Sequence, residues 1–400
     1  MNRHISAFAF VVVALAGVGC SDDDSSGNNP NPSADTGVQT DTGGTPGDVG
    51  ADTATACLKD VPSTYESPDY TTNAAAELSL RDRLKAIMDP MKAAEGDLTK
   101  KPTAAELKDL YAAGTPSLES LTTAYYAGKT KAIFDAFALA AGNTWTPAAT
   151  PTGNGGKFGA YLYDAYGKDL RQQVEKGAFG ATFYNRAAAL AADKAGLSEA
   201  AIDKLVALYG AHPSFPQATE GVPNPDIWVA QYAKRRDDKT QATPGLYRRI
   251  KTSLITAKAA IKAKCDAERD AALNAFLLDW EKVELATVIF YLNDAAKKIE
   301  AATTADQQSS AIHAIGESMA FIHGFRQHGA ATRKITDAQI DELLGLIGAP
   351  ADGNATVYQL VTDTATALPK FKTAVGQVTT KIAGIYGFTE ADVASYKNSY

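Results

Sequence analysis

Residues 266–302 read DAERDAALNAFLLDWEKVELATVIFYLNDAAKKIEAA, and residues 306–328 read DQQSSAIHAIGESMAFIHGFRQH. In both stretches apolar side chains recur every three to four positions, which predicts two consecutive helices joined by a short turn. We expect this helical hairpin to form the centre of the fold. Four polar residues interrupt its apolar faces, and they are the types that a metal site or an acid/base pair needs: Glu281, Glu284, His313 and Glu317.

The remainder of residues 59–400 has the same character. It is rich in Ala, shows long helical periodicity and contains no sustained run of alternating β-branched residues. This pattern predicts an all-α protein, a helical bundle with two packed lobes of antiparallel helices at 59–215 and 225–400. The division falls in a proline-rich segment, HPSFPQATEGVPNPD, at residues 212–226.

Local signals predict where individual helices begin and end. Asn73 is expected to cap a helix that Pro90 ends or kinks, and a capping box at Thr103 starts the next helix. Single helices are expected over residues 117–141 and 166–192, and a loop over 143–159.

Small residues mark one face of the helix expected at 166–192. Gly177, Gly180 and Ala181 lie about one turn apart, and a helical glycine costs about 1 kcal/mol relative to alanine. We therefore expect another helix to pack closely on this face. Gln173 and Lys176 flank the face and are candidates for a ligand site.

The N-terminus reads MNRHISAFAFVVVALAGVGC, with a short basic start and an apolar core over residues 5–18. The core is shorter than the roughly 20 residues of a spanning helix, so residues 1–20 are expected to be a secretion signal. Its end, Gly17-Val18-Gly19-Cys20, resembles a bacterial lipobox. The resemblance implies a lipid on Cys20 that anchors the protein in the cell envelope, at the outer membrane and facing the periplasm or the exterior; the alternative is ordinary secretion.

The stretch after the signal is acidic. Residues 21–56 contain seven Asp and no Lys or Arg, and such a segment cannot bury enough apolar surface to fold, so residues 21–58 are expected to be a disordered tether. The remaining chain is close to neutral, which argues against a nucleic-acid partner. With Cys20 assigned to lipid, Cys57 and Cys265 are left either to form a disulfide or to stay two free thiols.

His313 and Glu317 lie four residues apart and therefore on one helical face. This pair can bind a divalent metal, with Glu281 as a further ligand, or the carboxylate can orient the imidazole as a base. The alternative is structural, with Glu281 paired to Lys176 and His313 hydrogen-bonded to Glu317. The residues expected to line a shared ligand site are Lys176, Gln173, Glu281 and Glu284.

Other prominent side chains have simpler interpretations. Trp280 and Tyr291 are expected in the apolar core. His212, His323 and His328 are expected at the surface, because they lie in a loop or near a helix end.

Three stretches carry a resemblance to a known family: VEKGAFGATFYN (174–185), WEKVELATVIFYLNDA (280–295) and HAIGESMAFIHGF (313–325). They resemble bacterial lipoproteins classed as domain of unknown function 4856, which implies a helical envelope lipoprotein without an established activity. The architecture is more distantly similar to imelysin-like proteins, two-lobed helical bundles linked to iron acquisition, whose signature is G-x-H-x-x-E. Here residues 311–317 read AIHAIGE, so the leading Gly is Ala311 and the Glu comes one residue late.

The preferred hypothesis is a non-enzymatic, lipid-anchored protein of the cell envelope. It would bind a metal or metal complex, iron or another divalent metal, in a cleft lined by Lys176, Glu281, His313 and Glu317. One alternative is a structural or protein-interaction lipoprotein without a ligand site. The other is a metal-dependent hydrolase, although the chain contains no H-E-x-x-H spacing.

Overall fold

The computed structural model describes residues 57–215, 225–237, 244–329 and 332–398. The expected signal, Cys20 and nearly all of the tether lie outside these residues, as does much of the proline-rich segment. Residues Thr55–Tyr400 form one compact unit, and the expected division of this unit into two lobes stays a prediction.

The described chain is mainly helical, which confirms the predicted all-α helical bundle. In the first part of the chain, the elements are α1 (Tyr70–Asn73), α2 (Ala75–Gly96), α3 (Ala104–Ala112), α4 (Leu118–Leu121), α5 (Ala124–Ala140), β1 (Gly156–Phe158), β2 (Tyr161–Tyr163), α6 (Leu170–Ala178), the π-helix η1 (Phe179–Tyr184), α7 (Asn185–Ala192) and α8 (Glu199–Tyr209). They are followed by α9 (Trp228–Arg235), α10 (Leu246–Ala263), α11 (Asp266–Ala301), α12 (Ala305–His323), α13 (Asp337–Leu346), α14 (Gln359–Thr362), α15 (Thr364–Tyr386) and α16 (Glu390–Tyr396).

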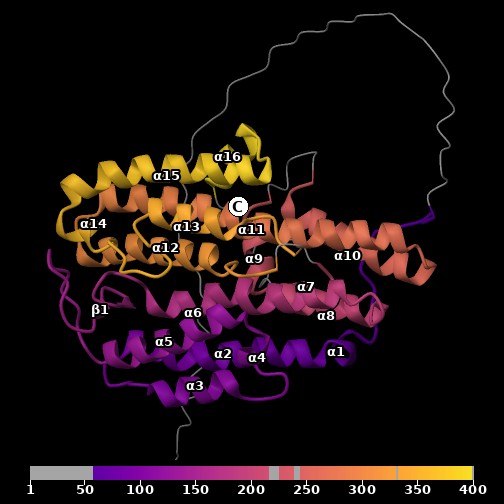
Figure 1. The fold of residues 1–400 in the computed structure, drawn as a ribbon, viewed down its shortest axis with the longest axis horizontal. Helices are drawn as coiled ribbons and strands as arrows, with labels where there is room; N and C mark the ends of the chain where they lie inside the picture. The colour runs from indigo at the N-terminus through magenta and orange to yellow at the C-terminus, as the bar shows by residue number, and fades with distance from the viewer. Residues whose placement is uncertain (1–56, 216–224, 238–243, 330–331, 399–400) are drawn as a thin grey trace, which may run out of the picture. The chain divides into compact units, whose positions relative to one another are not determined.

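The helices are stacked in layers, and α11 lies in the middle of the C-terminal ones (Figure 1). It packs against α12 as the predicted hairpin and also against α10 and α15. On the other face of α12 lies α6, which in turn contacts α5 and α2, with α3 outermost. The helix α6 therefore links the N-terminal helices to the central hairpin, beside smaller contacts that η1 and α7 make with α11.

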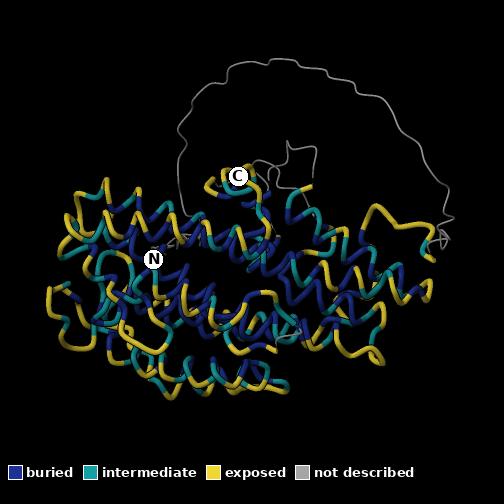
Figure 2. Tube along the Cα trace, turned by 45° about the horizontal axis from the view of Figure 1, so that its top comes forward, coloured by how far each residue is buried: buried dark blue, intermediate teal, exposed yellow. Residues whose placement is uncertain are grey.

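Burial follows this layering: the buried segments run through the middle of the stack, and exposed residues line its outer helices (Figure 2). Aromatic rings fill much of the interior. Trp280 is fully buried and contacts the rings of Tyr184, Tyr209 and Phe276. Tyr291 is also buried, so both predicted core aromatics are confirmed.

Two predicted helix boundaries differ from the structure. Pro90 does not end its helix, since α2 continues through it to Gly96, although an interior proline costs about 3 kcal/mol. Ile87, Met88 and Met91 are buried on both sides of the proline, and this packing helps to compensate for its cost. The capping box at Thr103 is confirmed, but Asn73 ends α1 and does not cap α2.

The helix predicted over residues 117–141 is divided into α4 and α5, and the segment 143–159 is not entirely loop. It includes β1, which pairs with β2 in an antiparallel hairpin. Between α4 and α5 the backbone N–H of Thr123 donates to the carbonyl of Ala181, and the hydroxyls of Thr122 and Thr182 are 2.6 Å apart. The break thus lets these threonines bind η1.

Residues 166–192 do not form one regular helix, because the turns of η1 are wider than α-helical turns. A π segment leaves carbonyl groups without an i+4 partner, and the one at Ala181 accepts from Thr123. The predicted close approach at the small residues is confirmed. A Cβ at Gly180 would lie 2.8 Å from the carbonyl carbon of Gly324, and one at Gly324 would lie 2.9 Å from the oxygen of Gly177.

The start of the described chain is held at two points. Cys57 and Cys265 form a disulfide between this segment and the residue before α11. Asp203, buried on α8, accepts hydrogen bonds from Ser67 at 2.7 Å and Asn73 at 2.7 Å, and its other oxygen accepts from Lys258 at 3.0 Å. The N-terminal segment is therefore joined to α8 and α10.

Substituting Gly180 with alanine should destabilise the protein by about 1–3 kcal/mol, because the new methyl group would overlap the backbone of Gly324 at the end of α12. Gly376 on α15 is the matched control, since a Cβ there meets nothing within 4 Å. Gly376→Ala should raise stability by about 0.5–1 kcal/mol. Urea unfolding of both variants tests this, and a stabilised Gly180→Ala would contradict the close helix contact.

Candidate functional site

The site begins at the N-terminus of α6, where Asp169 has two roles. One carboxylate oxygen caps the helix by accepting from the backbone N–H of Gln172 at 3.0 Å. The other oxygen is 2.7 Å from Nδ1 of His313 on α12. Because an ionised carboxylate can only accept hydrogen bonds, Nδ1 carries the proton and donates a hydrogen bond to Asp169. This bond was missed by the sequence analysis, which expected Glu317 to hold the imidazole.

Asp169 can come this close because residue 316 is glycine. A Cβ at Gly316 would lie 2.7 Å from the Cβ of Asp169. On one face of the imidazole the ring of Tyr161, from β2, stacks with its centroid 3.7 Å away and the planes 6° apart. His313 is consequently enclosed by α6, by the β hairpin and by its own helix.

The second ring nitrogen of His313 faces Glu317. Nε2 lies 3.8 Å from Oε2 of Glu317, which is too long for a hydrogen bond. Burial by itself lowers the pKa of His313, but the charge of Glu317 and the hydrogen bond with Asp169 outweigh it, so the pKa is raised above its usual value. The surroundings of His313 therefore favour positive charge at this ring.

Arg171, two residues after Asp169 on α6, binds two carboxylates. Its Nε donates to Glu95 of α2 at 2.7 Å, and its Nη1 donates to Glu175 at 2.9 Å. Burial raises the pKa of Glu95 to about 7 in spite of the arginine. The second oxygen of Glu95 is buried and has no hydrogen-bond partner among the described residues.

Lys176 completes the same face of α6. Its Nζ is 3.2 Å from Oε1 of Glu175 and 3.3 Å from Oε1 of Glu317. It also lies 5.0 Å from the ring centre of Tyr232 and 5.5 Å from that of Phe179. Burial lowers the pKa of Lys176, but Glu175 and Glu317 more than reverse this effect, so the side chain stays charged.

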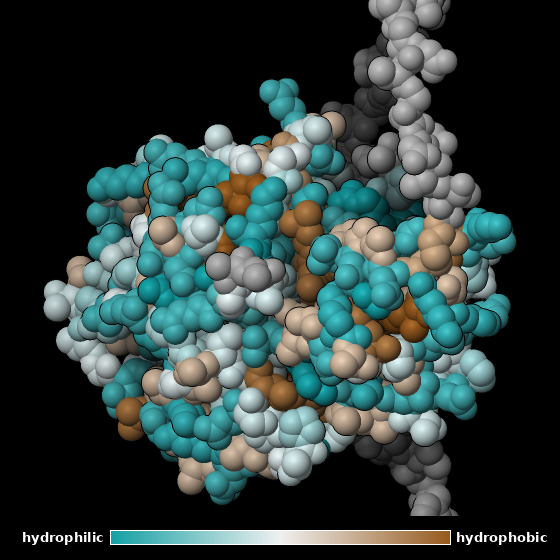
Figure 3. Space-filling model, turned by 45° about the vertical axis from the view of Figure 1, so that its right-hand side comes forward, coloured by the Kyte–Doolittle hydropathy of each residue, from teal (hydrophilic) through white to brown (hydrophobic). Residues whose placement is uncertain are grey.

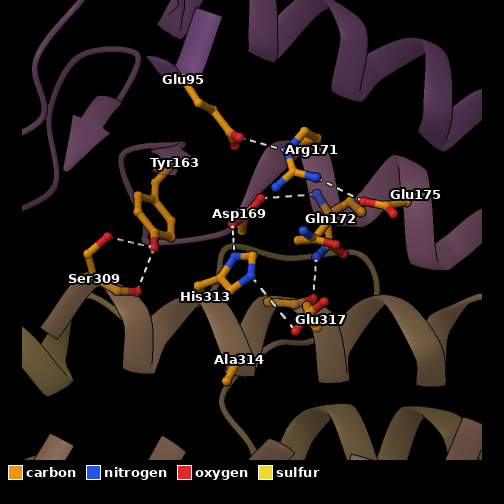
Figure 4. A network of polar contacts seen from close by, with 12 residues as sticks. Glu95, Tyr163, Asp169, Arg171, Gln172, Glu175, Ser309, His313, Ala314 and Glu317 are labelled. Carbon is orange, nitrogen blue, oxygen red and sulfur yellow. Dashed lines mark hydrogen bonds and ion pairs between the residues drawn. The ribbon is translucent and has the colours of Figure 1, made fainter. Parts of the chain in front are cut away.

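These contacts form one continuous group, which we call the α6 network. Figure 4 shows the part of it that runs from Glu95 through Arg171 and Asp169 to His313 and Glu317. Its four carboxylates face two positively charged side chains and one histidine, so the network carries a charge of −2 when His313 is neutral and all four carboxylates, Glu95 included, are ionised. Its members come from α2, α6 with its cap, and α12: Glu95, Asp169, Arg171, Glu175, Lys176, His313 and Glu317.

Among the predicted ligand residues, the structure brings together Gln173, Lys176, His313 and Glu317. The side-chain amide of Gln173 donates to the carbonyl of Gly316 at 2.8 Å, so it joins α6 to α12. The predicted ion pair between Glu281 and Lys176 is not formed, because Lys176 binds Glu175 and Glu317 instead.

Glu281 and Glu284 lie elsewhere. Glu281 accepts from the hydroxyls of Tyr184 and Tyr386 and from the backbone N–H groups of Lys334 and Ile335, at 2.8–3.2 Å. Tyr184 also contacts the ring of Phe325, so Glu281 is level with the end of α12. That end is ten residues beyond His313, which corresponds to roughly 15 Å of helix. The predicted shared cleft is therefore not formed.

Glu284 is a buried acid with one hydrogen bond. Trp280 Nε1 donates to one of its oxygens at 2.8 Å, and the other oxygen has no partner among the described residues. Burial raises the pKa of Glu284 well above its usual value, which favours the neutral form of this side chain. It is part of the aromatic core around Trp280.

Two histidines expected at the surface are buried. His328 contacts the rings of Tyr184 and Phe325. His323 packs against Tyr126, and its Nε2 lies 3.1 Å from the hydroxyl of Tyr125. Burial lowers the pKa of His323 to about 3 and that of His328 to about 4. The sequence prediction failed because the turn after α12 packs against η1.

The residues that the sequence analysis missed are Glu95, Asp169, Arg171 and Glu175. A signal for the last three was present, because the segment 169–176, DLRQQVEK, directly precedes the small residues of α6 and η1. Charged side chains beside a close helix contact become buried and then need partners. No comparable local signal marks Glu95, which only the packing of α2 brings to Arg171.

One other group resembles a metal site within the described ranges. Cys57, Cys265 and Glu268 place ligand atoms within 4.8 Å of one another, but both sulfurs are used by the disulfide. Glu268 instead accepts from the backbone N–H of Cys57 at 2.9 Å. This group therefore stabilises the N-terminal segment and is not a metal centre.

Three cavities open away from the α6 network. One of about 330 Å³ lies beside Tyr247 of α10, one of about 470 Å³ lies beside the disulfide, and one of about 680 Å³ lies between α2 and α3. None of the three is lined by a residue of the network, so none offers a substrate space of the kind that a hydrolase needs beside His313. From the side of α10 the surface is mostly hydrophilic, with small separate hydrophobic areas (Figure 3).

Replacing His323 with Gln should weaken the acid sensitivity of the protein. The folded state keeps this imidazole neutral down to a pKa of about 3, whereas the unfolded chain takes up the proton near pH 6.5. Stability is therefore lost as the pH falls, by about 1.4 kcal/mol per pH unit between about pH 6 and pH 4.

Urea unfolding at several acidic pH values should show this loss in the wild type and a slope smaller by that amount in His323→Gln. The exposed His212 provides the control variant His212→Gln. Equal slopes for the wild type and His323→Gln would contradict a neutral, buried imidazole.

No protein-family model, no curated protein and no solved structure matches this chain. Within the described ranges, no helix combines the length and the apolar character needed to cross a bilayer. The resemblances to lipoprotein families stay predictions, and what the protein binds has to follow from the chemistry of its own residues.

Proposed function

We propose that this chain is a lipid-anchored helical protein of the cell envelope that binds a divalent metal reversibly at His313 and Glu317. The observation that carries the proposal is the 3.8 Å separation between Nε2 of His313 and Oε2 of Glu317. Asp169 holds the proton on Nδ1, so the lone pair of a neutral His313 is on Nε2 and faces a carboxylate. Two such groups repel each other unless a positive charge lies between them.

A metal ion fits this gap better than a proton does. A proton on Nε2 cannot make a normal hydrogen bond over 3.8 Å. Metal bonds to imidazole nitrogen and carboxylate oxygen are each about 2.1 Å long, and two of them can span that separation. Asp169 has the role of the carboxylate that orients a metal-binding histidine through its other nitrogen.

The charge of the α6 network supports the same proposal. With His313 neutral and Glu95 ionised the network carries −2, and one divalent cation neutralises it. Without a metal, two protons can do so, one on His313 and one on Glu95, whose pKa is about 7. Metal binding should therefore compete with protons and be stronger at alkaline than at acidic pH.

Two protein ligands indicate an exchangeable metal. Structural metal sites usually supply four protein ligands, and catalytic sites three. The pair thus suits a protein that takes up and releases iron or another divalent metal, in line with the resemblance to imelysin-like proteins.

A structural role is the second candidate, and one observation favours it: the positive charge that Glu317 needs is already supplied in part by Lys176. In that case the α6 network only joins α2, α6 and α12. The experiment below separates the two candidates.

Isothermal titration of the full-length protein with Zn²⁺, and anaerobically with Fe²⁺, should show one binding site at neutral pH. His313→Ala and Glu317→Gln should each weaken binding at least tenfold, because each removes a ligand. His212→Ala, which removes an exposed histidine, should leave it unchanged. Lack of binding by the wild type, with His313→Ala only lowering stability, would favour the structural role.

The anchoring part of the proposal rests on Cys20, which lies outside the described residues. In bacterial cells that make the full-length chain, the wild type should take up labelled palmitate and fractionate with membranes. Cys20→Ser should lose the label and appear in the soluble periplasmic fraction. Unlabelled wild-type protein in that fraction would indicate ordinary secretion.

A further inference from the structure

We propose that Lys176 sets the affinity of the His313–Glu317 pair for divalent cations, as a built-in cation that competes for the same carboxylate. This inference rests on the proposed metal binding and adds the residue that controls it. Oε2 of Glu317 faces His313 at 3.8 Å, and Oε1 faces the Lys176 ammonium at 3.3 Å. A metal on Oε2 would therefore share its carboxylate with a positive charge that is already bound.

Lys176 cannot easily move away to relieve this competition. Its ammonium is also held at 3.2 Å by Glu175, and the rings of Tyr232 and Phe179 lie 5.0 and 5.5 Å away. The side chain is buried, and so it has no solvent position to adopt. Its positive charge is a permanent feature of the site.

The consequence is a weakened site for metal ions. Lys176 lowers the negative charge of the network from −3 to −2 when His313 is neutral. Like charges repel strongly in a poorly solvated interior, so each unit of charge near His313 changes the metal affinity. A protein that takes up a metal and has to release it again benefits from a limited affinity for that metal.

Three variants of the full-length protein remove one or both of the paired charges at the same place, and a fourth keeps them. Relative to the wild-type network at −2, Glu175→Gln gives −1, Lys176→Gln gives −3, and the double variant Glu175→Gln/Lys176→Gln returns to −2. Lys176→Arg keeps the charge and serves as the conservative control. The readout is the dissociation constant for Zn²⁺ at neutral pH, from titration against a competing chelator.

The affinity for Zn²⁺ should increase as the charge of the α6 network becomes more negative. Lys176→Gln should bind Zn²⁺ at least about tenfold more tightly than the wild type, and Glu175→Gln more weakly. The double variant and Lys176→Arg should stay within about threefold of the wild type. The melting temperature of Lys176→Gln should also become dependent on Zn²⁺, because the ion replaces a lost positive charge.

The possible outcomes separate the role of Lys176 from metal binding itself. Wild-type binding through His313, together with no tighter binding in Lys176→Gln, would overturn the role of Lys176 and leave the proposed function intact. Lack of Zn²⁺ binding by both the wild type and Lys176→Gln would overturn both. If Lys176→Gln does not fold, the double variant is compared with Glu175→Gln, and equal affinities in that pair would overturn the role of Lys176.

Discussion

The rest of this structure depends on the pairing of charged groups where α6 passes between α2 and α12. An ionised side chain that is buried without a partner costs several kcal/mol, so the position of each charged residue here determines the next. Arg171 joins α6 to α2 through Glu95, and Asp169 joins it to α12 through His313. The network thereby sets the relative position of helices whose paired residues lie 76 and 144 positions apart in the sequence.

This pairing is possible because the helices approach unusually closely. Gly316 leaves room for Asp169, and Gly180 packs backbone to backbone with Gly324. The wide turns of η1 also help the helices to pack, because they leave the Ala181 carbonyl free to accept a hydrogen bond from the backbone N–H of Thr123. Small residues and a π segment, each unfavourable in an isolated helix, are compensated by the contacts that they permit.

The same arrangement connects stability to function. A network that is complete in hydrogen bonds would be only structural, but this one has a carboxylate and an imidazole nitrogen that face each other at 3.8 Å. Its charge can be balanced by protons or by a divalent ion. A buried site with a built-in competing lysine would hold a metal loosely, and loose binding suits the handling of a metal more than catalysis on it.

The sequence by itself determined the all-α class, the α11–α12 hairpin and the close contact at Gly180, because helical periodicity and small-residue spacing are local properties of the chain. It also identified His313 and Glu317 as neighbours on one face. Only the tertiary structure decided that Asp169 binds His313 and that Glu281 lies at the far end of the hairpin. The partner of a buried charge is chosen by packing between distant segments, and no local pattern records that choice.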